Sequence, residues 1–366
     1  MGLKAGIVGL PNVGKSTIFN ALTKSAIPAE NYPFCTIDPN IGVVEVPDKR
    51  LQNISSIFKP KSIIPSTIEF VDIAGLVRGA SQGEGLGNQF LSHIRDVDAI
   101  IHVVRSFNED NITHVEGSLD PLRDIETIET ELLIRDIASV EKRLVKATKS
   151  ARTGDKDYIK EVAVLNSILP KMNNDTLVHD IKLSSDERLL IRPLSLLTDK
   201  PTLYLVNIDE NEIDTNNINN DLQKLTEFAK KRGNSTIQLC GKVESEIANL
   251  NEEERNFFLE EYNISEPGLN KLINASYSLL GLETFFTAGE KEVRAWTIPK
   301  NTNAPNAAGQ IHSDIQRGFI KAEVYSYSEL MELKAETALK EAGKIRQEGK
   351  NYIIQDGDII FFKFNV

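Results

Sequence analysis

The sequence predicts an α/β domain that is interrupted by a long helical segment and followed by a separate α+β domain. Three observations lead to this prediction. Within residues 1–122, short apolar runs that suit a buried parallel sheet alternate with helix-like segments. Apolar residues then recur at helical spacing among many charges, and the strand pattern resumes at Thr202. Beyond Gly281 the pattern changes again, to short strands separated by polar turns.

The elements of the α/β part follow in chain order. A strand at Leu3–Val8 leads to a helix at Thr17–Lys24. We expect five more strands in this part of the chain: Ile41–Val46, Thr67–Val71, Ala99–Val104, Thr202–Ile208 and Thr236–Cys240. The discontinuous domain that contains them is placed at residues 1–122 and 201–282.

The segment between these two parts has the pattern of a helical hairpin. Apolar residues spaced four, three and four apart mark one face of a long, coiled-coil-like helix over Asp124–Ser150: Leu133, Ile137, Val140 and Leu144. A second helix is expected over Asp157–Met172, and Ser184–Glu187 has the pattern of a capping box that opens a third. We place this inserted α-helical domain at residues 123–200.

The C-terminal part, residues 283–366, has a different pattern of short strands. Four strands are expected there: Phe285–Thr287, Val293–Thr297, Lys321–Tyr325 and Ile359–Phe364. The Asn/Pro/Gly-rich run Pro299–Gly309 breaks the pattern between strands, and Ser328–Glu341 has helical composition. This part is therefore predicted to be an α+β domain.

Composition limits the class of protein. The 366 residues carry a net charge of −11, so no general electrostatic grip on nucleic acid is expected, although a local basic face could still contact RNA. Cys35 and Cys240 are too few for a zinc site and fit a reducing compartment. No apolar run is long enough to span a membrane, and Met1 leads directly into the first strand. We expect a cytoplasmic protein without a signal peptide.

Residues Gly9–Ser16 match the phosphate-binding pattern G-x-x-x-x-G-K-[ST] between a predicted strand and a predicted helix. Backbone N–H groups at such a helix N-terminus bind phosphate, the lysine reaches the β- and γ-phosphates, and the serine hydroxyl binds Mg²⁺. The pattern therefore predicts a nucleoside triphosphate site. Its expected nucleotide contacts in the loop are Asn12, Val13, Gly14, Lys15, Ser16 and Thr17.

Further residues complete this site. Asp72, at the end of a predicted strand, is expected to hold Mg²⁺ together with Ser16, and the Gly75 N–H would approach the γ-phosphate. Thr36 lies between these motifs. It is either a switch threonine that completes Mg²⁺ coordination when the γ-phosphate is present, or a loop threonine in a local turn.

The base-reading segment departs from the guanine-specific pattern [NT]-K-x-D. Asn207 matches its first position, whereas Ile208 replaces the lysine and Glu210 replaces the aspartate. The longer side chain of Glu210 misplaces the carboxylate that would bind guanine, so we expect ATP to be preferred over GTP. Cys240 and Gly241, followed by Lys242, occupy the place of the second base loop.

Together, these motifs resemble the Obg-like ATPases, the YchF branch of the translation-factor-related P-loop GTPases. The long run from Asp72 to Leu91 is the most specific part of the resemblance, which covers essentially the whole chain. Ala307–Asp314 and Arg317–Ile320 are similar to that family's TGS domain, a β-grasp module. The resemblance implies a Ras-like nucleotide domain, Mg²⁺-dependent ATP hydrolysis, a cytosolic monomer, and association with the large subunit or the whole ribosome.

The position that carries a water-orienting glutamine in Ras-like enzymes is Leu76 here, which can neither donate nor accept a hydrogen bond. His114 lies in a polar loop that leaves the sheet at its ligand-binding edge. The resemblance points to the same residue as the catalytic histidine, and the alternative is a solvated loop residue. Asn12 either helps to hold K⁺ beside the phosphates, as in related cation-dependent enzymes, or makes a local turn bond.

These observations leave three hypotheses for function. The first is a slow switch ATPase whose nucleotide state controls docking to the translation machinery. The second is a nucleotide-gated ribosome- or RNA-binding module in which hydrolysis is incidental. The third is a GTPase with relaxed base specificity.

Overall fold

A computed structural model describes residues 3–24, 40–73, 93–107, 119–213, 220–262 and 264–365. By their contacts, the described residues divide into two compact units. One contains residues 3–24, 40–42 and those from 69 to 272, and the other contains residues 43–68 and 273–365. The domain limits given above stay a prediction. No helix within the described ranges has both the length and the apolar composition needed to cross a membrane.

The first sheet has six strands. Across the sheet they are β2 (Ile41–Glu45), β4 (Thr67–Asp72), β1 (Lys4–Val8), β5 (Ala99–Arg105), β6 (Thr202–Asn207) and β7 (Ser235–Leu239). Strand β1 pairs in parallel with β4 and β5, and β5, β6 and β7 continue in parallel. Every residue of β5 is buried, as expected for a parallel strand covered on both faces. The α/β prediction is confirmed, with strand limits that differ by one or two residues.

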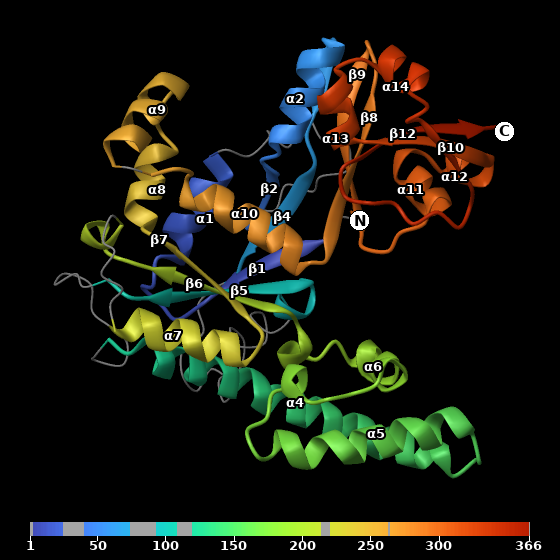
Figure 1. Cartoon of the computed structure of the whole chain (residues 1–366). Coiled ribbons are helices and arrows are strands. Elements are labelled where there is room, and N and C mark those ends of the chain that lie inside the picture. Colours follow the sequence, from blue (N-terminus) through green and yellow to red (C-terminus); the bar gives the residue numbers. More distant parts are fainter. Residues whose placement is uncertain are drawn as a thin grey trace. The chain divides into compact units, whose positions relative to one another are not determined.

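Helices cover both faces of this sheet. They include α1 (Lys15–Lys24), α7 (Asn220–Lys231), α8 (Gly241–Ile247), α9 (Glu252–Glu261) and α10 (Gly268–Leu279). Figure 1 shows α7 and α4 (Pro121–Ala151) on one side of the sheet and α1 and α8 on the other. Tyr204, Val206 and Leu225 belong to a core cluster under α7. Helix α1 begins at Lys15, two residues before its predicted start.

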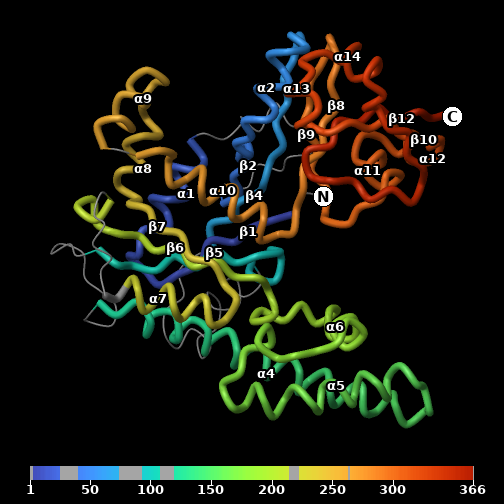
Figure 2. Tube along the Cα trace, in the orientation of Figure 1, coloured from blue at the N-terminus to red at the C-terminus, as the bar shows by residue number. Residues whose placement is uncertain are grey.

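The helical insertion is formed by α4 together with α5 (Lys156–Met172) and α6 (Ser185–Ile191), as predicted. Figure 2 shows α4 and α5 running side by side, and Val140 and Leu165 lie in the core cluster that joins them. The Asp120 carboxylate caps α4 by accepting the N–H of Arg123. The predicted capping box is present at the start of α6, between Ser184 and Glu187.

The second sheet also has six strands. Across the sheet they are β11 (Arg346–Glu348), β10 (Phe319–Ser326), β12 (Asp358–Phe364), β8 (Leu282–Ala288), β9 (Glu292–Pro299) and β3 (Ser62–Ile64). Strand β12 pairs in parallel with β8, and β3 pairs in parallel with β9. The pairs β10–β11, β10–β12 and β8–β9 are antiparallel. The helices here are α2 (Lys49–Phe58), α11 (Ala304–Ile311), α12 (Ser313–Arg317), α13 (Tyr327–Leu333) and α14 (Glu336–Glu341). This is the α+β domain that the sequence predicts.

Several elements of this unit were not predicted, among them α12 and β11. The run Pro299–Gly309 is not wholly irregular, because α11 begins within it at Ala304. The side-chain oxygen of Asn303 caps that helix by accepting the N–H of Asn306. The proline in the first turn has no N–H, and the first turn of a helix does not need one. Helix α2 and strand β3 were not predicted either, although Asp48 is a favourable N-cap for α2.

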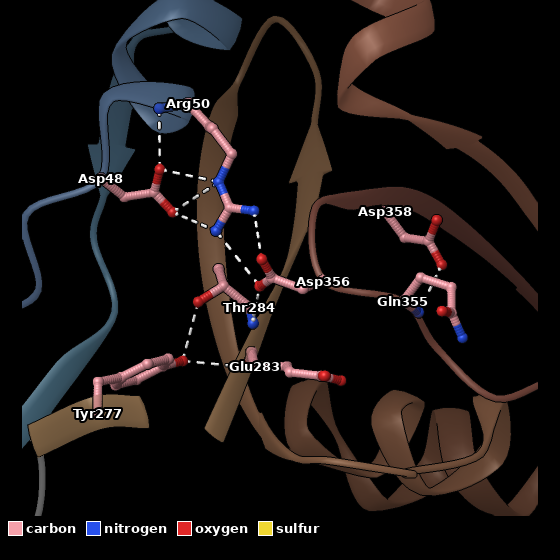
Figure 3. A network of polar contacts seen from close by, with 8 residues as sticks. All are labelled: Asp48, Arg50, Tyr277, Glu283, Thr284, Gln355, Asp356 and Asp358. Atoms are coloured by element: carbon pink, nitrogen blue, oxygen red, sulfur yellow. Dashed lines mark hydrogen bonds and ion pairs between the residues drawn. The ribbon is translucent and has the colours of Figure 1, made fainter. Parts of the chain in front are cut away.

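Arg50 joins α2 to the C-terminal part of the same unit (Figure 3). Its guanidinium donates to both oxygens of Asp48 and, through Nη1, to Oδ2 of Asp356 at 2.7 Å. Asp356 in turn accepts the N–H of Thr284 at 2.9 Å. Burial disfavours the charged guanidinium, but these two carboxylates outweigh it and raise the pKa of Arg50. Residues 43–68 are therefore tied to residues 273–365 by charged hydrogen bonds as well as by β3.

Candidate functional site

The predicted phosphate-binding residues lie at the carboxyl edge of the first sheet. In the register of the parallel strands, Ile7 is opposite Asp72, Val8 is opposite His102, and Asn207 is opposite Leu239. Ligands of open parallel sheets bind at this edge, because the loops that leave the strands meet there. The sheet therefore brings the phosphate loop, the Mg²⁺ carboxylate and the base-reading segment together.

Both glycines of the phosphate loop are required by close approach of the backbone. Gly14 has a φ of +95°, and a Cβ there would lie 2.3 Å from Nδ2 of Asn207. A Cβ on Gly9 would lie 2.5 Å from the carbonyl oxygen of Val103. The loop leads directly into α1, whose first N–H groups have no partner within the helix. Their place at the start of a helix fits the anion site that the motif predicts.

Lys15 is buried in this loop, with its side chain folded back on the backbone. Its ammonium donates to the carbonyl oxygen of Leu10 at 2.7 Å. Burial lowers the pKa of Lys15 to about 8, and the charge of Asp72 acts against that shift. An anion that entered the loop would supply the ammonium with a stronger, charged partner.

Ser16 and Asp72 fit a Mg²⁺ ion. The Ser16 hydroxyl lies 3.5 Å from Oδ2 of Asp72. Oδ1 of Asp72 is buried and has no hydrogen-bond partner within the described residues. Burial raises the pKa of Asp72, while the nearby charge of Lys15 lowers it. A carboxylate oxygen and a hydroxyl are the oxygen ligands that Mg²⁺ takes beside phosphates, so the donor set suits that ion.

Asn207, the first residue of the predicted base-reading segment, is buried between the phosphate loop and the Cys240–Gly241 loop. Its Nδ2 donates to the carbonyl oxygen of Val13 at 3.0 Å, and its Oδ1 accepts the N–H of Gly241 at 2.8 Å. Both groups of the amide are thus used within the protein. Asn207 fixes the phosphate loop relative to the base loop, and this bridging role was not predicted from the motif.

The two substituted base-reading positions behave differently. Ile208 is 5% exposed, and its side chain packs in the core with Val206 and Leu222. Its predicted role in nucleotide binding stays a prediction. The Glu210 carboxylate accepts a hydrogen bond from the ammonium of Lys242 at 3.0 Å. This ion pair was not predicted. The sequence did place Lys242 in the second base loop, near the expected position of Glu210, and that placement could have indicated the pair.

Comparison with known proteins identifies the family. The chain is 53% identical over 366 residues to the "Ribosome-binding ATPase YchF" of Bacillus subtilis (strain 168), with 100% of both chains covered. The chain belongs to the YchF family. The protein of the same name from Escherichia coli O157:H7 is 52% identical, again over 100% of both chains. Two family models also match: "50S ribosome-binding GTPase" over residues 4–147, and YchF-GTPase_C, described as a protein of unknown function, over residues 282–365.

Solved structures agree with membership of the YchF family. The YchF GTPase of Schizosaccharomyces pombe matches with a TM-score of 0.89 and 41% identity, covering 99% of this chain and 98% of that one. A GTP binding protein from Pyrococcus horikoshii OT3 has a TM-score of 0.63 at 21% identity, which supports the fold alone. The fold is therefore a YchF-type P-loop domain with a helical insertion and a C-terminal domain.

Several predicted site residues of this YchF family member lie outside the described residues: Thr36, Gly75, Leu76 and His114. Their roles stay predictions. Asn12, in the loop, is exposed and has a φ of +62°, and Thr17, in the first turn of α1, is also exposed. Cys240, at the start of the base loop, is 6% exposed and packs in the core. Its neighbour Gly241 contributes the N–H bond to Asn207.

Proposed function

We propose that this protein is a Mg²⁺-dependent ATPase that associates with the ribosome and uses its nucleotide state as a switch. The observation that carries the proposal is the meeting of Lys15, Asp72 and Asn207 at one sheet edge, beside a helix N-terminus. The curated relatives that span the whole chain bear the name ribosome-binding ATPase. A monomer in the cytoplasm, bound to the large subunit or the whole ribosome, fits this proposal.

The proposed ligands of Mg²⁺ are Ser16, Asp72 and, when the γ-phosphate is present, Thr36. When bound, the ion would neutralise charge on the β- and γ-phosphates. Lys15 would hold the same phosphates, and the N–H of Gly75 would approach the γ-phosphate. Asn12 is the proposed ligand for a K⁺ ion beside them.

The proposed catalytic residue is His114. Leu76 cannot orient a water molecule, whereas a neutral imidazole can hold one by a hydrogen bond. In the chain, His114 follows β5 and precedes α4. Strand β5 is a central strand of the first sheet, and its carboxyl end lies at the edge that carries the other candidate site residues.

ATP is the proposed nucleotide. The guanine-reading aspartate is absent, and Glu210 in its place is engaged by Lys242. The Asn207 amide uses one of its two N–H groups and one lone pair of its oxygen within the protein. The proposed base contacts are therefore Asn207 itself, the segment around Ile208 and the Cys240–Gly241 loop.

The experiment that tests the switch is single-turnover ATP hydrolysis with and without ribosomes, beside ribosome binding in ATP and in ADP. We expect ribosomes to accelerate hydrolysis and ATP to strengthen ribosome binding relative to ADP. If ATP controls binding but ribosomes leave the rate unchanged, the protein is a nucleotide-gated binding module instead. Equal hydrolysis of GTP and ATP would favour a GTPase with relaxed specificity.

A further inference from the structure

A cavity of about 610 Å³ lies in the helical insertion, away from the phosphate loop in the chain. One wall is apolar and comes from the segment that follows α6, with Pro193, Leu194 and Leu197. The other wall is α4. Five cationic side chains line the cavity: Arg95, Arg135, Lys142, Arg143 and Lys146. No acidic residue lines it, although the chain as a whole has a net charge of −11.

The spacing of these cations places them on one face of α4. Arg135, Lys142 and Lys146 are separated by seven and four residues, which are close to whole turns of an α-helix. Arg135 and Lys146 are eleven positions apart, which is about 16 Å along the helix axis. The neighbouring face of α4 packs Leu133 and Val140 into the core of the insertion, so the cationic face has a fixed direction.

The acidic groups near the cavity are already engaged. Glu161 accepts two hydrogen bonds from Arg143, at 2.6 and 2.8 Å. Asp136 is buried and accepts the N–H groups of Leu197 and Thr198 as well as the Thr198 hydroxyl. These bonds also hold the apolar wall against α4.

Arg95, Lys142 and Lys146 also present charge to the cavity. Arg95 donates to the neutral hydroxyl of Ser139 at 3.2 Å. Among the described residues, Lys142 and Lys146 form no ion pair. Both lysines are exposed at the cavity, so a ligand that entered could contact them without breaking an existing bond.

We propose that this cavity binds a small ligand that carries several phosphate groups, of about the size of a nucleoside polyphosphate. Closely spaced phosphates would complement the cations of α4 through charge-assisted hydrogen bonds. The apolar wall at Pro193, Leu194 and Leu197 would cover the uncharged part of the ligand. The volume lies within the range of small-molecule sites in proteins. This second site is distinct from the phosphate loop and does not depend on the function proposed above.

The test uses inorganic tripolyphosphate as the probe and the full chain with Lys15→Ala, because the phosphate loop would otherwise bind the probe as well. Calorimetry should show saturable binding that weakens as salt is added. The double variant Lys142→Glu/Lys146→Glu should weaken it at least about tenfold. The matched control Lys149→Glu/Arg152→Glu makes the same charge change further along α4, outside the cavity, and should alter binding less than about twofold.

A second measurement locates the site without any change at the cavity. Tripolyphosphate should protect Lys142 and Lys146 from amine acylation, read by mass spectrometry, while Lys149 stays reactive. The proposal is overturned if tripolyphosphate does not saturate the chain, if the control variant loses as much affinity, or if only RNA binds through these cations. A separate titration of the unaltered chain with ATP tests the phosphate loop. A failure of the cavity proposal is therefore distinguished from a failure of the nucleotide site.

Discussion

The side-chain amide of Asn207 donates to the carbonyl oxygen of Val13 across 3.0 Å and so connects the end of β6 to the phosphate loop. Its other polar atom accepts the N–H of Gly241. One buried side chain therefore sets the distance between the groups that would hold phosphate and base.

Replacing Asn207 by aspartate tests this connection. The change would put an acceptor opposite the Val13 carbonyl oxygen and leave a buried polar group unsatisfied. We expect a loss of about 1–3 kcal/mol in the free energy of unfolding and weaker nucleotide binding. Chemical denaturation and calorimetry would measure both. Asn20→Asp, at an exposed position of α1, is the matched control; an equal loss there would argue against a special role for Asn207.

Lys15 and Ser16 are expected to carry phosphate and Mg²⁺ binding. Lys15→Ala should abolish triphosphate binding, because no other described cation enters the loop. Ser16→Ala should weaken it only when Mg²⁺ is present. Equilibrium titrations with and without Mg²⁺ would measure these effects, with Lys24→Ala in the last turn of α1 as the control. Unaltered binding by Lys15→Ala would refute the assignment.

ATP should bind at least about tenfold more tightly than GTP, a difference of ~1.4 kcal/mol. The reason is that Ile208 is buried and the Glu210 carboxylate pairs with Lys242. Glu210→Asp alone should not restore full GTP specificity, since position 208 still lacks a lysine. Affinities for both triphosphates and both diphosphates would settle the preference, and equal values for ATP and GTP would contradict it.

His114→Ala should lower the single-turnover rate of ATP hydrolysis by at least about 10²-fold, the lower end of the effect of a positioned acid or base. Nucleotide affinity should change little, because the side chain would contact the attacking water and not the bound phosphates. His179→Ala, in the helical insertion, is the control. An unchanged rate would assign His114 to a solvated loop, and a matched loss of affinity would indicate a role in ordering the loop.

His102 predicts a pH dependence of stability. It is 3% exposed in β5, and burial together with the charge of Lys15 lowers its pKa to about 3, from 6.5. Between pH 6.5 and about pH 3, His102 binds a proton in the unfolded chain but not in the folded chain. The free energy of unfolding therefore falls as the pH decreases below 6.5. The variant His102→Gln lacks this group, so its free energy of unfolding should fall less steeply with decreasing pH, by up to about 1.4 kcal/mol per pH unit.

Denaturation curves for the unaltered chain and His102→Gln, taken from pH 7 to pH 5, would measure this difference in slope. The variant can be less stable at every pH, because the comparison depends on the slope alone. His93→Gln changes an exposed histidine and should leave the slope as it is. Parallel curves for the unaltered chain and His102→Gln would contradict the prediction.

Local sequence patterns predicted an element correctly where the residues of that element alone determine its structure. The spacing of Leu133, Val140 and their neighbours predicted α4, and Ser184–Glu187 predicted the start of α6. The same was not true of α2 and β3. The apolar residues of α2 pack against strands more than 200 positions later in the chain, and β3 is held by pairing with one of these strands, β9. A sequence window contains no information on such partners.

By itself, the sequence determined the order of the elements, the glycines of the phosphate loop and the loss of the guanine-reading motif. Each of these depends on residue type and near-neighbour spacing, which backbone sterics and helix or strand periodicity translate directly into structure. Only the tertiary structure decided that Asn207 bridges two loops, that Lys242 engages Glu210, and that Arg95 and four cations of α4 line one cavity. The two hydrogen bonds join side chains distant in the chain, and the cavity joins α4 to Arg95 and to residues 193–197. The packing of the sheet and of α4 fixes these separations.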